Sequence, residues 1–183
     1  MIADVGNGAS SAFEVGLDAE IRLTRQEDLS DLEWFGLYTC HRALIREAFE
    51  RQESGEMLML LAEVNDFPAG QLWIDLRRPA SLPAAYLWAL RVFPVLRGAG
   101  LGSRLLEAAE RALRRLGVAA VEIGVELDNS RAGALYERRG YRPLRQERER
   151  CEFTAPSGKR VRFPVDMRIL RKPLVHGPAR RAE

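Results

Sequence analysis

The segment from Val92 to Leu116 restricts the possible folds of this chain more than any other part of it. An apolar stretch ends at Val92, a turn with Gly98, Gly100 and Gly102 follows, and apolar residues then recur at helical spacing as far as Leu116. Glycine permits a tight turn, and the first turn of a helix leaves backbone N–H groups free to bind an anion. We therefore predict a strand, a phosphate-binding turn and a helix from about Gly100 to Leu116.

Spacing distinguishes three phosphate-binding loops that such a turn could form. A dinucleotide-binding G-x-G-x-x-G that starts at Gly98 would need glycine at position 103, which is Ser103. A Walker A loop would need Gly-Lys-Ser or Gly-Lys-Thr, and this region contains no lysine. What remains is R-x-x-G-x-G from Arg97 to Gly102, with V-x-P just before it. A glycine-rich turn without a ligand is the alternative.

The rest of the chain continues this alternation of strand and helix patterns. Helices are predicted at Ser130–Arg139 and from about Asp28 towards Arg51, broken near Gly36, with Thr24 to Glu27 as a capping box that opens the second of these regions. Apolar or alternating runs predict strands at Ile21–Leu23, Met57–Val64, Ala69–Asp75, Ala84–Val92, Val118–Leu127, Tyr141–Phe153 and Val161–Leu170. This order predicts an α/β protein of the α+β type, with helices packed on a mixed sheet.

Length and composition limit the domain count and the partners. The 183 residues suit one domain, at residues 20–172, between a flexible arm, 1–19, and a flexible tail, 173–183. A net charge of +2 lacks the basic field of non-specific nucleic-acid binders, so no nucleic-acid partner is expected. No apolar run approaches the ~20 residues of a membrane span, and the N-terminus lacks a signal-peptide pattern, so we expect no membrane association and a cytoplasmic location.

Cysteine and histidine are too scattered to suggest a metal site. Cys40 and Cys151 lie outside any CxxC pattern, which leaves neither a disulfide framework nor a thiolate zinc site to predict. His41 and His176 are isolated from other ligand types, so no metal is expected. Only two of the 28 basic residues are lysines, a skew typical of a GC-rich, bacterial genome.

A second motif lies downstream of the glycine-rich turn. Residues 129–141 read N-S-R-A-G-A-L-Y-E-R-R-G-Y. Together with Arg97–Gly102, this segment resembles the GNAT superfamily of acetyl-CoA-dependent N-acetyltransferases, whose motifs are Q/R-x-x-G-x-G/A after the fourth strand and N-x-x-A-x-x-L-Y-x-x-x-G-[FY]. The resemblance covers about residues 20–172. It implies a mostly antiparallel sheet of six to seven strands, with the fourth and fifth splayed apart, flanked by about four helices.

The resemblance also implies acetyl-CoA as cosubstrate and assigns residues to it. The backbone of Leu90, Arg91 and Val92 would bind the pantetheine arm as an added strand does. Asn129 would contact the same arm, and Tyr136 would place its hydroxyl near the sulfur. Loop amides would surround the pyrophosphate, with the Arg97 side chain adding charge; the loop residues are Arg97, Gly98, Ala99, Gly100, Leu101, Gly102 and Ser103.

Acetyl transfer to an amine needs an acid and a base. A lysine-like amine has a pKa near ~10.4 and must lose a proton before it attacks, while an acid should protonate the departing thiolate. Tyr136 is the predicted acid, although it could instead be a core tyrosine that positions the sulfur. Glu122, Gly124 and Glu126 alternate along one strand face, so two carboxylates are available, and Glu126 is the candidate base because it lies closest to the splay that the resemblance implies. A solvated glutamate at the strand end, or a water relay held by Tyr86, is the alternative.

The acceptor is less defined than the cosubstrate. By resemblance, Trp34, Phe35, Tyr86 and Trp88 are candidate substrate-binding residues, although Trp88 could equally fill the core. The leading function is acetyl transfer to a primary amine of a small molecule or peptide. The alternatives are a protein N-terminal or lysine acetyltransferase and a non-catalytic acyl-CoA-binding module. Gly124 weakens the N-terminal alternative, since members that acetylate protein N-termini often carry glutamate there. A homodimer is expected only by analogy.

Overall fold

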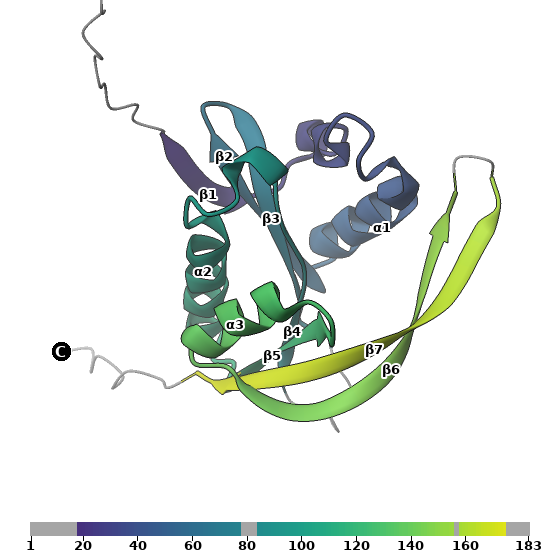
Figure 1. Ribbon diagram of the computed structural model, residues 1–183. Coiled ribbons are helices and arrows are strands. Elements are labelled where there is room, and N and C mark those ends of the chain that lie inside the picture. Colours follow the sequence, from purple (N-terminus) through teal and green to yellow (C-terminus); the bar gives the residue numbers. More distant parts are fainter. Residues whose placement is uncertain (1–17, 78–83, 156–157, 175–183) are drawn as a thin grey trace, which may run out of the picture.

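A computed structural model describes residues 18–77, 84–155 and 158–174 (Figure 1). Its seven-stranded sheet has the order β1-β2-β3-β4-β5-β7-β6. The β4–β5 pair is parallel and the other neighbouring pairs are antiparallel. The predicted mixed sheet is therefore confirmed. Its strands are β1 (Ala19–Leu23), β2 (Met57–Val64), β3 (Phe67–Asp75), β4 (Ala85–Val92), β5 (Ala120–Glu126), β6 (Arg142–Thr154) and β7 (Arg160–Pro173).

Helices cover both faces of the sheet. The helix α1 (Arg42–Glu53) packs on one face, and α2 (Leu101–Arg115) packs on the other together with α3 (Ser130–Arg138), as Figure 1 shows. We name these the α1 face and the α2 face. Short 3₁₀ helices precede α1 and α2; they are η1 (Gln26–Asp28), η2 (Asp31–Glu33), η3 (Thr39–His41) and η4 (Pro94–Leu96).

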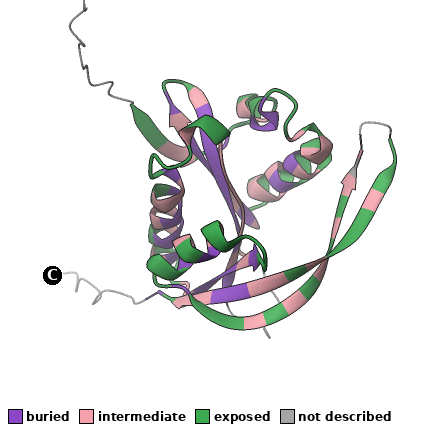
Figure 2. Cartoon of the chain, viewed as in Figure 1, coloured by how far each residue is buried: buried purple, intermediate pink, exposed green. Residues whose placement is uncertain are grey.

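The apolar run of β2 follows from this double cover. A strand buried on both faces needs apolar side chains at successive positions rather than at alternate ones. Figure 2 shows the central strands buried between the helices. On the α1 face β2 contributes Met57, Met59 and Leu61 to one core cluster, and on the α2 face it contributes Leu60, Ala62 and Val64 to a second.

The first helical region differs from the prediction. In place of a helix from Asp28, the chain forms the turns η1 to η3, and α1 begins only at Arg42. The capping box at Thr24 is also wrong: the N–H of Arg25 donates to the carboxylate of Asp28 at 2.6 Å. Trp34 has a left-handed φ of 44°, and its indole N–H donates to the carbonyl of Pro68 at 2.6 Å. This tertiary bond fixes Trp34 in a conformation that no helix can contain.

The strands β4 and β5 separate part-way along their length. Their parallel pairing covers Ala85 to Leu87 of β4 and Val121 to Ile123 of β5. Beyond that point β4 continues to Val92, where it pairs only with β3, while β5 pairs only with β7. The predicted splay of these two strands is confirmed. Beyond the splay, the backbone N–H and C=O groups of β4 and β5 that face each other form no hydrogen bonds between the two strands.

The described elements run from Ala19 to Pro173. The predicted arm, 1–19, and tail, 173–183, lie almost wholly outside the described residues, and residues 156–157, between the last two predicted strands, lie outside them as well. In the described part of the chain, we find no helix with the length and apolar character needed to cross a membrane.

The packing of α2 on the sheet makes a stability prediction. Leu105 is fully buried against the α2 face, so Leu105→Ala leaves a cavity there. We expect this change to lower the free energy of unfolding by about 3 kcal/mol. Arg111→Ala, at an exposed position of the same helix, is the matched control and should change it by less than about 0.5 kcal/mol. Urea unfolding followed by circular dichroism measures both; an equal effect of the two changes would contradict the packing.

Candidate functional site

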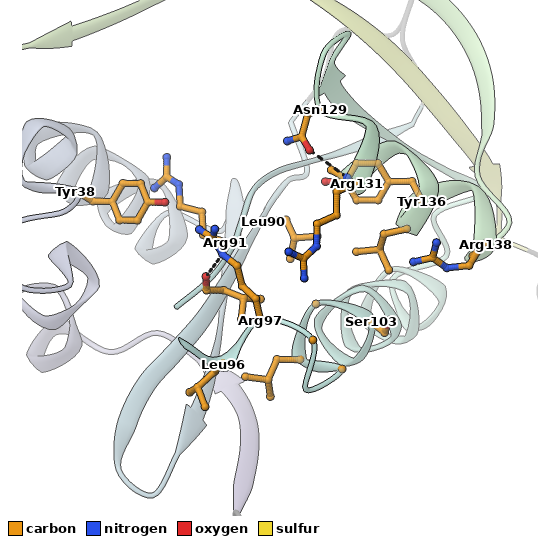
Figure 3. A pocket seen from close by; sticks show the side chains of 17 residues that line it. Tyr38, Leu90, Arg91, Leu96, Arg97, Ser103, Asn129, Arg131, Tyr136 and Arg138 are labelled. Carbon is orange, nitrogen blue, oxygen red and sulfur yellow. Dashed lines mark hydrogen bonds between the residues drawn. The ribbon is translucent and has the colours of Figure 1, made fainter. Parts of the chain in front are cut away.

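A pocket of about 490 Å³ lies between β4, the start of α2 and α3 (Figure 3). It borders the part of β4 after Leu87, which no longer pairs with β5. The pocket therefore combines a strand with an open edge and two helix N-termini. The residues that line it are Tyr38, Leu90, Arg91, Val92, Leu96, Arg97, Gly98, Gly100, Leu101, Gly102, Ser103, Asn129, Arg131, Ala132, Leu135, Tyr136 and Arg138.

The glycine-rich turn presents backbone donors to this pocket. Gly98 and Gly100 have left-handed φ angles of 96° and 85°, which glycine adopts without strain. The first backbone hydrogen bond of α2 runs from the N–H of Arg104 to the carbonyl of Gly100, at 3.1 Å. Within the described residues, the N–H groups of Leu101 to Ser103 have no backbone acceptor. Three donors and the positive end of the helix dipole therefore point to one place, which suits an anion.

Most residues predicted to bind the cosubstrate come together here. Leu90, Arg91 and Val92 contribute from β4, and Asn129 and Tyr136 contribute from the start and middle of α3. Of the loop from Arg97 to Ser103, every residue except Ala99 lines the pocket. The side chain of Asn129 also caps α3, since its Oδ1 accepts from the N–H of Ala132 at 3.1 Å.

The pocket is rich in arginine. Arg97 folds back on β4, and its Nε donates to the carbonyl of Val92 at 3.2 Å. Arg131 and Arg138 were missed by the sequence reasoning, although their spacing of seven on α3 puts them on one helix face and could have been noticed. Among the described lining residues there is no aspartate or glutamate. The pocket is therefore suited to a ligand with several negative charges.

Tyr136 lies in the wall of the pocket and projects into it from α3 (Figure 3). Only 5% of the residue is exposed. Burial raises the pKa of its hydroxyl to about 12, because the phenolate would be poorly solvated there. The hydroxyl thus keeps its proton throughout the neutral pH range and can donate a hydrogen bond or a proton.

The candidate base and relay residues lie on the α1 face, outside the pocket. A Cβ atom at Gly124 would lie 2.3 Å from the hydroxyl of Tyr86 and 3.0 Å from Cε of Met167. The Tyr86 hydroxyl therefore occupies the space that a side chain at position 124 would take. Glu126 is exposed at the end of β5. Glu126 also affects Cys151 of β6: the pKa of the Cys151 thiol is raised mainly by burial and next by the negative charge of Glu126.

The aromatic residues predicted to bind substrate are also outside the pocket. Trp88 packs edge-on against Trp73 on the α1 face, with ring centroids 4.7 Å apart. Trp34 is buried, Phe35 is exposed, and both line a second cavity of about 530 Å³ beside η2. The ring of Trp34 lies 5.3 Å from that of Tyr38, which lines the first pocket. The assignment of these residues to substrate stays a prediction.

No metal site is found in residues 18–77, 84–155 and 158–174, where no three His, Cys, Asp or Glu side chains gather as metal ligands would.

Sequence comparison gives two matches. A profile of the acetyltransferase (GNAT) family matches residues 23–141, well over half of the chain. Mycothiol acetyltransferase of Beutenbergia cavernae is 45% identical over 58 residues, which make up 32% of this chain and 20% of that protein. The chain therefore spans about a fifth of the length of this relative.

Structure comparison finds the same fold in several acetyltransferases. The ribosomal-protein-S18-alanine N-acetyltransferase of Escherichia coli has a TM-score of 0.66 at 20% identity, over 91% of this chain and 100% of that chain. An N-acetyltransferase of Staphylococcus aureus Mu50 has a TM-score of 0.69 at 17% identity, over 86% and 99%. The PaiA N-acetyltransferase of Thermoplasma acidophilum, in complex with coenzyme A, has a TM-score of 0.61 at 20% identity, over 85% and 99%.

Proposed function

Because the chain belongs to the acetyltransferase (GNAT) family, we propose that it transfers the acetyl group of acetyl-CoA directly to a primary amine of a small molecule or peptide. The observation that carries this proposal is the convergence of three features on one pocket: the open edge of β4, the free N–H groups at the start of α2, and the arginines of α3.

The residues around the pocket fit the chemical groups of acetyl-CoA. The N–H groups of Leu101 to Ser103 would bind the pyrophosphate, and Arg131 and Arg138 would neutralise its remaining charge and that of the 3′-phosphate. The free edge of β4 at Leu90 to Val92 would bind the pantetheine amides as a neighbouring strand does. When bound, acetyl-CoA supplies the thioester whose acyl group is transferred.

Two side chains carry the proton transfers in this proposal. Tyr136 donates its hydroxyl proton to the thiolate sulfur as the C–S bond breaks, and its raised pKa keeps that proton in place until then. On the opposite side of the splay, Glu126 takes the proton from the attacking amine, directly or through a water held by Tyr86. The amine thus attacks in its neutral form, and the acid and the base act from opposite sides of the sheet.

The surroundings of Gly124 favour a small-molecule or peptide acceptor over a protein N-terminus. The Tyr86 hydroxyl fills the space where family members that acetylate protein N-termini often carry a glutamate, so this chain has no carboxylate there. A non-catalytic acyl-CoA-binding module is the other alternative, and the presence of Tyr136 in the pocket wall speaks against it.

Calorimetric titration with acetyl-CoA, followed by thiol release against a panel of amines, tests the proposal. We expect micromolar binding and release of coenzyme A with one class of primary amine. Peptides with free N-termini form a separate arm of the panel. Binding without release in any arm would favour the non-catalytic module, and the absence of binding would contradict the assignment of the pocket.

A further inference from the structure

A bulge in β4 turns one arginine away from the glycine-rich turn. Between the pairs Trp73–Trp88 and Gln71–Arg91, β4 has two residues where β3 has one, and Ala89 has a left-handed φ of 52°. Side chains of β4 on either side of the bulge, such as Leu87 and Leu90, pack on the α2 face. Arg91 consequently points to the α1 face, while the pyrophosphate-binding turn lies at the start of α2 on the other face.

The guanidinium of Arg91 is largely buried and has no counter-charge among the described residues. It lies over the ring of Tyr38, 4.4 Å from the ring centroid, and 5.8 Å from that of Trp73. Its Nη1 is buried and has no hydrogen-bond partner, and no carboxylate of the described residues pairs with it. Figure 3 shows the side chain extending towards Tyr38, away from Arg97. A ring face attracts a cation but cannot accept the in-plane hydrogen bonds that a guanidinium donates.

Other polar groups on the same face also lack partners. The side-chain amide of Gln71, opposite Arg91 in the sheet, and the indole N–H of Trp73 are buried and form no hydrogen bond in the described part of the chain. The charge of Arg91 also affects His41: the pKa of the His41 imidazole is lowered mainly by burial and next by repulsion from Arg91. An arginine keeps its proton even when it is buried. This region therefore holds a positive charge and polar groups that lack the negative charge and hydrogen-bond partners such groups usually have.

We propose that Arg91 binds a carboxylate of the acceptor, so that the preferred amines are amino acids or peptides that carry a carboxylate near the reacting amine. This inference rests on the proposed acetyl transfer. The guanidinium borders the cosubstrate pocket at its Tyr38 end, and it faces the side of the sheet where Tyr86 and Glu126 lie. A planar carboxylate accepts two hydrogen bonds from the guanidinium fork and supplies the missing charge.

A carboxylate fits this place better than a phosphate. One buried guanidinium balances one negative charge, whereas a phosphate monoester carries about −1.5 to −2 charges at neutral pH. Among the other arginines of the pocket, Arg97, Arg131 and Arg138 are exposed, and they lie on the turn and on α3 rather than on the α1 face. Excess negative charge at Arg91 would therefore stay uncompensated and poorly solvated.

The test measures product binding and so does not depend on turnover. N-acetyl amino acids with small, aromatic, acidic and basic side chains, and the matching N-acetyl carboxamides, are titrated calorimetrically onto the complex of the protein with coenzyme A. In the unmodified protein we expect at least one acid to bind about 30-fold or more tightly than its carboxamide. Equal affinity of acid and carboxamide in every pair, or no binding of any acid at 10 mM (about the weakest binding that calorimetry detects), overturns the proposal.

Two variants separate this role from cosubstrate binding. Arg91→Met should reduce the preference for the acid to less than about threefold. Arg97→Met removes an arginine at the other end of the same pocket and should keep the preference, whatever its effect on coenzyme A. If Arg91→Met does not fold, the comparison of acid with carboxamide in the unmodified protein still decides.

Failure of the proposed acetyl transfer has a different signature. Thiol release from acetyl-CoA is measured with amino acids and amino acid amides as acceptors. Release with both at equal efficiency keeps the acetyltransferase function and overturns the carboxylate site. Tight binding of an N-acetyl amino acid with no release from any amine supports the carboxylate site and contradicts the acetyl transfer.

Discussion

Replacement of Tyr136 by phenylalanine is expected to lower the rate of acetyl transfer by about 100-fold or more, with little change in the affinity for acetyl-CoA. The change removes one hydroxyl from the pocket wall and keeps the ring that packs beside Tyr141. Without a proton donor the departing thiolate leaves unprotonated, and a positioned general acid contributes about 10² to 10⁴ in rate. Steady-state kinetics by thiol release and calorimetric titration of acetyl-CoA measure the two quantities.

Tyr141→Phe is the matched control for this change. Both tyrosines are buried, and their ring centroids lie 6.1 Å apart, but Tyr141 does not line the pocket. We expect this control to keep the rate within about threefold of the unmodified enzyme. Because burial raises the pKa of Tyr136 to about 12, the pH–rate profile should also show no loss of activity from its ionisation below about pH 10. A Tyr136→Phe variant with unchanged turnover would exclude the hydroxyl as the acid.

Gly100→Val is expected to weaken acetyl-CoA binding by about 100-fold or more. Gly100 precedes α2 with a φ of 85°, a conformation that strains any β-branched side chain. A shift of this residue moves the N–H groups of Leu101 to Ser103 away from the pyrophosphate, and each hydrogen bond to a charged group contributes about 1.5–3 kcal/mol. Calorimetric titration with acetyl-CoA measures the loss.

Gly117→Val controls for the backbone strain. Gly117 follows the same helix, has a φ of 74° and, like Gly100, would have no atom within 4 Å of an added Cβ. Both variants should therefore lose a similar amount of unfolding free energy, about 1 kcal/mol or more. Only Gly100→Val should lose affinity for acetyl-CoA, and equal losses of affinity would show that the turn does not bind the pyrophosphate.

Patterns carried by consecutive residues predicted most of the fold. The run from Met57 to Val64 matches β2 residue for residue, and the helix predicted at Gly100–Leu116 differs from α2 by one residue at each end. In both segments most of the apolar residues of the sequence pattern are buried in the two core clusters. The region before α1 could not be predicted in this way, because the bond from Trp34 to Pro68 joins residues far apart in sequence.

The parts of the candidate site that could be predicted are those that lie within a sequence motif. The turn from Arg97 to Ser103 and the segment that begins at Asn129 could be identified because they resemble two motifs of the GNAT family, and residues of both line the pocket. The orientation of Arg91 could not, since strict alternation along β4 would put it on the same face as Leu87. The bulge at Ala89 reverses that order, and its φ of 52° has no signature in the sequence.

The contact between Tyr86 and Gly124 also limits the order in which this site can diverge during evolution. With 2.3 Å between the Tyr86 hydroxyl and a Cβ at position 124, a carboxylate cannot be acquired there while the tyrosine keeps its rotamer. Unless Tyr86 moves to another rotamer, a smaller residue at position 86 has to come first, or both codons have to change together. Among descendants of this sequence we therefore expect tyrosine at 86 together with a large residue at 124 to be rare, and an engineered change of acceptor should begin with Tyr86.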